Sequence, residues 1–142
     1  MTVRHLLLIV LLNLVSYAYA FDEKDMGTYF VVHNDGHVTS EAFRLFRDNK
    51  SLKIQGRQPD NSWKDILCGN LHCVLRTSTK KDIDGMFDSN ALSQIVPDCV
   101  NSQSFAFCRY TLVKDSAFVG YLFVATDRKP AVVIRLAKEP TQ

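Results

Sequence analysis

The sequence has no excess of charge of either sign, and its acids and bases are interleaved. Seventeen lysines and arginines stand against 15 aspartates and glutamates, and the two signs alternate in segments such as Lys80–Asp84. A protein that binds nucleic acid normally gathers its basic side chains on one face. We therefore expect no nucleic-acid partner.

The sequence also lacks a long apolar run. The most apolar stretch, Leu6–Val15, is interrupted by Asn13 and falls short of the roughly 20 residues that a membrane-crossing helix needs. We therefore expect no membrane insertion once the N-terminal segment has been removed.

Common catalytic and cofactor-binding motifs are missing as well. The chain contains no GxSxG, HExxH, GxxxxGK or GxGxxG pattern, which mark serine hydrolases, zinc proteases and nucleotide-binding enzymes. We expect no cofactor, and a binding protein is favoured over an enzyme.

The first 20 residues have the features of an export signal. Arg4 gives a positive start, an apolar core follows, and Ala18-Tyr19-Ala20 forms the small-x-small pattern that a signal peptidase cleaves. Cleavage after Ala20 would leave residues 21–142 as a single domain in the periplasm or the extracellular space. The environment there is oxidising, so disulfides are expected.

All four cysteines, Cys68, Cys73, Cys99 and Cys108, follow the predicted signal, and they allow three pairings. Spacing favours the local pairing, Cys68 with Cys73 and Cys99 with Cys108, because a four-residue loop can bring two strand ends within about 5.5 Å. A crossed pairing would tie the helical segment to the sheet. A zinc site that includes His72 is a further alternative, although oxidation competes with metal for exported thiols, so no metal is expected.

Hydrophobic patterns predict an α+β domain dominated by an antiparallel sheet of about six or seven strands. Residues 40–47 fit either a strand or a short helix, and the strand is favoured because Leu52–Gln55 alternates after a turn. We expect Trp63, Ile66 and Leu67 to share one buried strand. The predicted strand segments are residues 27–33, 40–47, 52–55, 63–68, 73–77, 104–113, 118–126 and 131–137.

The last three of these segments predict a meander of consecutive antiparallel strands. In the last strand, Val132, Ile134 and Leu136 are expected on one buried face. Between residues 78 and 96 the apolar residues approach helical spacing, which predicts two short helices ended by Pro97.

The loop between Cys68 and Cys73 is the candidate binding site. It presents Asn70, Leu71 and His72, and a disulfide-closed loop loses little conformational entropy when it docks. Over Cys68–Cys73 alone it is similar to the histidine-containing C-x4-C loop of periplasmic lysozyme inhibitors of the vertebrate-lysozyme type, which assigns no family. The similarity implies a loop histidine that donates hydrogen bonds to an enzyme's carboxylates.

The leading hypothesis is therefore an exported binding protein that recognises or occludes another protein, as inhibitors and immunity proteins do. One alternative is a small secreted hydrolase, such as a nuclease, that uses His33, His37 or His72 as acid and base. Another is a small-ligand carrier with a sheet curled around an apolar cavity.

Asp82 and Asp84 are interpreted as acids near a helix start, not as a catalytic pair or a calcium site.

Overall fold

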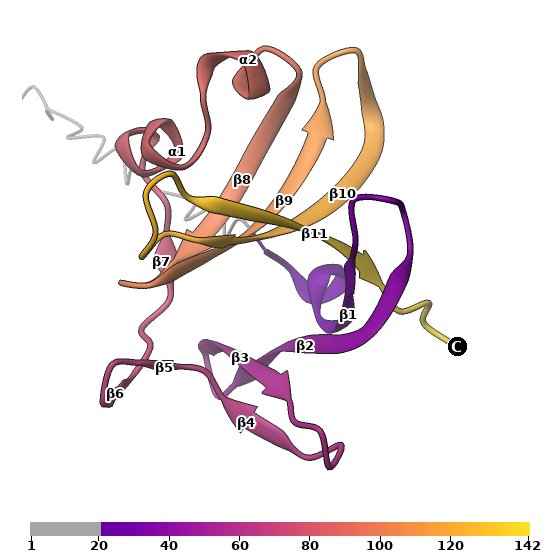
Figure 1. Cartoon of the computed structure of the whole chain (residues 1–142), viewed down its shortest axis with the longest axis vertical. Coiled ribbons are helices and arrows are strands. Elements are labelled where there is room, and N and C mark those ends of the chain that lie inside the picture. Colours follow the sequence, from indigo (N-terminus) through magenta and orange to yellow (C-terminus); the bar gives the residue numbers. More distant parts are fainter. Residues whose placement is uncertain (1–20) are drawn as a thin grey trace, which may run out of the picture.

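The computed structural model describes residues 21–142, so the predicted export signal lies outside the described residues. The described chain is mostly antiparallel β-structure with few helices (Figure 1). Its elements are η1 (Glu23–Asp25), β1 (Gly27–Val32), β2 (Val38–Asp48), β3 (Ser51–Arg57), β4 (Trp63–Asp65), β5 (Leu67–Cys68), β6 (Leu71–His72), β7 (Arg76–Thr77), α1 (Lys80–Met86), α2 (Ser89–Leu92), β8 (Ile95–Asn101), β9 (Phe105–Leu112), β10 (Asp115–Ala125) and β11 (Val132–Lys138).

Nine of the strands form one curled sheet in the order β4-β3-β2-β1-β11-β10-β9-β8-β7. The first strand lies beside the last, with Tyr29 opposite Lys138 and Val32 opposite Arg135. Beyond β4, the chain crosses from one end of the curled sheet to the other, and the small β5–β6 hairpin lies on this crossing (Figure 1). The sheet is thus curled and open, with β4 at one end of the strand order and β7 at the other.

The inner face of the curled sheet is filled by aromatic and aliphatic side chains. Alternate residues of each strand point inward, as the two-residue period of a strand requires. The ring of Tyr29 packs edge-on against Phe107 at 4.9 Å and against Tyr121 at 4.8 Å. The buried members of this cluster are Phe21, Tyr29, Val31, Leu45, Ile54, Val100, Phe105, Phe107 and Leu136.

The outer face of β8–β10 carries a second core beneath the two helices. Met86 and Phe87, at the end of α1, are buried with Ala106, Leu122 and Val124. Thr79 begins α1 with a capping box, in which its side chain accepts from Asp82 N and the Asp82 carboxylate accepts from Thr79 N. Strand β9 is therefore covered on both faces.

Several sequence predictions are confirmed. The sheet is mainly antiparallel, residues 40–47 lie within strand β2, and two short helices occupy residues 80–92. The C-terminal meander β9–β10–β11 is present, with Phe123 opposite both Phe107 and Ile134. Among residues 21–142 no helix is both long and apolar enough to cross a membrane.

Other predictions are wrong in detail. The sheet has nine strands instead of six or seven, and the strand that was missed is β8, because its first residues continue the helical spacing and Pro97 interrupts its pattern. Pro97 lies inside β8 rather than ending a helix, and it is tolerated there because this part of β8 pairs only with β9. The predicted Trp63–Cys68 strand is split between two sheets and leaves Leu67 exposed, while Val132 in β11 is also exposed.

Both disulfides have the local pairing that spacing favoured. Cys68 is bonded to Cys73 and Cys99 to Cys108, and no free cysteine remains in residues 21–142. Cys99 and Cys108 stand directly opposite each other across β8 and β9, with Cα atoms 4.1 Å apart. These cysteines are therefore not available as thiolate ligands for the zinc alternative.

The two disulfides should differ in their contribution to stability. Loop closure alone predicts about 2 to 3 kcal/mol for each, because the cross-linked segments are of similar length. The sulfurs of Cys99 and Cys108 are also buried in the second core, so C99A/C108A should lower the free energy of unfolding by at least about 1 kcal/mol more than C68A/C73A. Urea unfolding of both variants measures this, and equal losses would contradict a core role for Cys99–Cys108.

Candidate functional site

The β5–β6 hairpin carries the residues that the sequence indicated as a binding loop. Gly69 has a φ of 64°, a left-handed conformation that glycine adopts without strain, and it turns the chain between Cys68 and Leu71. The disulfide closes the hairpin with Cα atoms 5.0 Å apart. At its base, the Ser102 hydroxyl lies 3.4 Å from the Cys68 sulfur, which holds the hairpin against the β8–β9 turn.

Three aliphatic side chains on this hairpin are exposed to solvent. Leu71 is 70% exposed, Val74 is 72% exposed and Leu67 is 52% exposed. Asn70 and His72 are exposed as well. We call the segment Leu67–Val74 the cystine loop; it is a covalently closed surface with an apolar tip and polar neighbours.

A row of side chains on β2, β3 and β4 leads to His72. Arg44 Nε donates to Gln55 at 2.6 Å, and the Gln55 amide donates to Asp65 at 2.8 Å. Asp65 then faces His72 Nδ1 at 3.4 Å. The row follows the strand register, in which Arg44 is opposite Gln55 and Gln55 is opposite Asp65, so sheet geometry places the Asp65 carboxylate beside the histidine.

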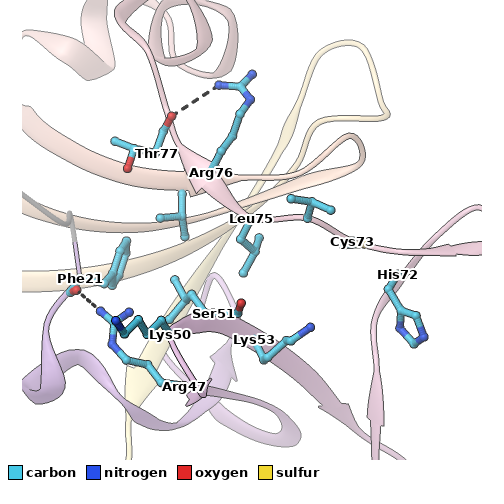
Figure 2. Close-up of a pocket in the computed structure, with 13 residues that line it drawn as sticks. Phe21, Arg47, Lys50, Ser51, Lys53, His72, Cys73, Leu75, Arg76 and Thr77 are labelled. Atoms are coloured by element: carbon cyan, nitrogen blue, oxygen red, sulfur yellow. Dashed lines mark hydrogen bonds between the residues drawn. The ribbon is translucent and has the colours of Figure 1, made fainter. Parts of the chain in front are cut away.

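Beside the cystine loop, a cleft of about 450 Å³ opens between the two ends of the sheet. One wall is the Arg47–Lys53 turn of β2 and β3, and the other is the His72–Thr77 segment (Figure 2). Phe21 and Val100, which are both buried in the core, also line it. The Leu75 side chain reaches toward the opposite wall (Figure 2). We call this feature the seam cleft.

Cations line the seam cleft, and no aspartate or glutamate does. Two of the cations are held by protein groups: Arg47 donates to the Phe21 carbonyl at 2.7 Å and faces Glu23, while Arg76 pairs with Asp82 at 2.7 Å. Lys50 and Lys53 form no ion pair with any carboxylate of residues 21–142. The cleft therefore holds positive charge that is not neutralised locally.

The sequence analysis did not identify Asp25, a fully buried carboxylate in η1 (0% exposed). Its oxygens accept from Tyr121 Oη at 2.8 Å, from the backbone N–H of Asp22 at 3.0 Å and from Arg109 Nη1 at 3.4 Å. The Tyr29 hydroxyl donates to the Asp25 carbonyl. A capping-box pattern at Asp22 and Asp25, directly before the first strand, is the sequence signal that could have found it.

This network changes the acidity of its two tyrosines. Burial, together with the hydrogen bond to the Asp25 carboxylate, raises the pKa of Tyr121 to about 12. Burial, followed by the nearby Tyr121, raises the pKa of Tyr29 well above its usual range. Both hydroxyls stay protonated at neutral pH and donate to Asp25, so the network anchors the N-terminal segment to the inner face of the sheet.

The other candidate residues lie apart from the cystine loop. His33 and His37 flank a hairpin turn with ring centroids 6.4 Å apart, and neither side chain has a hydrogen-bond partner in residues 21–142. Asp82 serves the helix cap, and its pairing with Arg76 holds its pKa far below the usual range. Asp84 pairs with Lys80 along α1. Within the part of the chain that the structure describes, no three potential metal ligands cluster.

Comparison with protein-family models, with curated proteins and with solved structures gives no match for this chain.

Asp25→Asn tests the anchoring network. Asparagine has only one carbonyl oxygen, so it cannot accept from Tyr121, from Arg109 and from the Asp22 N–H together as the carboxylate does, and the free energy of unfolding should fall by about 3 kcal/mol. Asp22→Asn is the matched control on the same helical turn, because asparagine caps as well as aspartate and should cost less than about 0.5 kcal/mol. Urea unfolding compares them, and a loss in D25N no larger than in D22N would contradict the role of Asp25.

The raised tyrosine pKa values predict a loss of stability at alkaline pH. An unfolded tyrosine deprotonates near pH 10.0, whereas Tyr121 in the folded protein does so near 12. The folded state therefore binds more protons between these values, and the free energy of unfolding must decrease as pH rises from 10 to 12. Unfolding curves across this range measure the slope, which should be smaller in Tyr121→Phe; an unchanged slope would contradict the assignment.

Proposed function

We propose that the chain is an exported binding protein that recognises or occludes another protein through its cystine loop. The partner surface has an apolar patch for Leu71 and a carboxylate within reach of His72. The observation that supports this most strongly is the exposure of Leu67, Leu71 and Val74 on a segment held rigid by a disulfide.

Exposed aliphatic side chains also occur elsewhere on the described chain, but the two most exposed large apolar residues, Leu71 and Val74, both lie on the cystine loop. Burial of one leucine side chain at an interface contributes about 1.5 to 3 kcal/mol. The net gain in binding free energy is larger when the loop loses little conformational entropy on binding. The disulfide and the Ser102 contact constrain the loop before a partner arrives.

The chemistry of the loop indicates what a partner must offer. His72 is the only ionisable group on the tip, and its Nδ1 faces Asp65, so its Nε2 edge is the one directed toward a partner. A hydrogen bond from an imidazole N–H suits a carboxylate oxygen. An enzyme with acidic groups in its active-site cleft meets this requirement.

The two disulfides support the proposed location outside the cytoplasm. Disulfides form and persist in oxidising compartments, and both bonds of this chain are formed. We propose the periplasm or the extracellular space as the place of action.

Capture and titration test the proposal. The purified protein, with both disulfides formed, is immobilised and exposed to the extracellular or periplasmic fluid of its source; a retained protein is identified, purified and titrated against variants by calorimetry. L71A/H72A should weaken binding at least about a hundredfold, because a central apolar anchor and its polar neighbour are both lost.

Val133→Ala is the matched control, since Val133 is another exposed aliphatic residue on a distant strand and its loss should leave affinity unchanged. Circular dichroism and thermal unfolding confirm that each variant is folded. If the retained protein binds L71A/H72A within twofold of the unaltered chain, the cystine loop is not the recognition surface.

A further inference from the structure

We propose that the seam cleft is a second binding site, which takes a small amphipathic anion: a carboxylate headgroup on a single alkyl chain. This inference does not depend on the protein partner proposed above. It combines two properties of the cleft, its unneutralised cations and its apolar inner end.

The headgroup site is defined by Lys50 and Lys53. Both line the cleft, and neither has a carboxylate partner among the described residues. Figure 2 shows Lys50 beside Arg47, and Lys53 on the same strand segment, toward His72. Arg76 lines the cleft too, but its guanidinium is directed away from these lysines and is occupied by Asp82 (Figure 2).

Positive charge without a local counterion favours an anion, and the absence of acidic side chains from the lining removes the competing attraction for cations. A carboxylate at either lysine ammonium group forms charge-assisted hydrogen bonds. The cleft is open to solvent, so this attraction should weaken as the salt concentration rises.

The alkyl-chain site is defined by the inner end of the cleft. Leu52 and Leu75 lie on its two walls, and Phe21 and Val100 close it toward the core. A volume of about 450 Å³ falls in the range of about 300 to 1,000 Å³ that small-molecule sites occupy. An apolar chain of modest length fits there with its charged end at the lysines.

The interior of the curled sheet does not offer the same space. Phe21, Tyr29, Phe105 and Phe107 are buried and pack ring against ring within it. The opening between the sheet ends is therefore where a small ligand reaches apolar surface. It exists because β3 pairs with β4 only through Gln55–Arg57, which leaves Ser51–Ile54 without a strand on that side.

The direct test is calorimetric titration of the purified protein with decanoate below its micellar concentration. We expect saturable binding of one decanoate per chain and a weaker affinity at high salt. Acetate, hexanoate and decanoate form a series of increasing alkyl length. If the alkyl chain is buried, each added methylene should raise the affinity by up to about fourfold. Decyltrimethylammonium, with the same chain and the opposite charge, should not bind.

Variants at the lysines test the assignment of the headgroup site. K50Q/K53Q should weaken decanoate binding about tenfold or more, whereas Lys114→Gln, an exposed lysine in the β9–β10 turn, should have no effect. Failure of decanoate to bind would overturn the proposal. So would equal affinity for decanoate and decyltrimethylammonium, or an unchanged affinity in K50Q/K53Q.

A single variant separates this site from the cystine-loop interface. Leu71 does not line the cleft, so Leu71→Ala should leave decanoate affinity unchanged even where it reduces binding to a protein partner. Loss of decanoate binding in K50Q/K53Q with partner binding intact would establish two separate sites. If Leu71→Ala abolishes binding to the protein partner and the unaltered chain does not bind decanoate, only the cleft proposal is overturned.

Discussion

The buried carboxylate of Asp25 is the constraint on which the arrangement of the sheet depends. A charged group removed from water is costly unless it is fully hydrogen-bonded, and Asp25 meets this requirement with Tyr121, Arg109 and a backbone N–H. These partners come from β9, β10 and the N-terminal turn, so the network exists only when the three are together. It thereby places Phe21 against Phe107 and orders the segment that leads into β1.

Both candidate sites result from the incomplete closure of the curled sheet. The strand order ends at β4 on one side and β7 on the other, and the chain that connects them cannot pair along its full length. This connection includes the β5–β6 hairpin, which projects from the body of the molecule (Figure 1). The cystine loop and the seam cleft are adjacent because His72 and Val74 belong to both. A disulfide replaces the backbone pairing that this segment lacks.

Much of the fold could be predicted from local patterns. Strand β2, the helical segment and the C-terminal meander are long enough for a period of two or 3.6 residues to appear. The local disulfide pairing followed from loop length, and the exposed cystine loop follows from its Cys68–Cys73 spacing. Strand β8 was missed, because the helical spacing before it and Pro97 within it masked its strand pattern. Pro97 was predicted to end a helix, because the local sequence does not show that this part of β8 pairs with a strand on one side only.

By itself the sequence indicated most of the strand segments, favoured the local pairing of the cysteines and showed which loop carries Asn70, Leu71 and His72, since each depends on residues close along the chain. Only the tertiary structure decided that β1 pairs with β11, that Asp25 is buried and that Lys50 and Lys53 face the His72–Thr77 segment. Those features join residues that are far apart in sequence, and their positions follow from how the whole sheet twists and curls. No pattern within a short window contains that information.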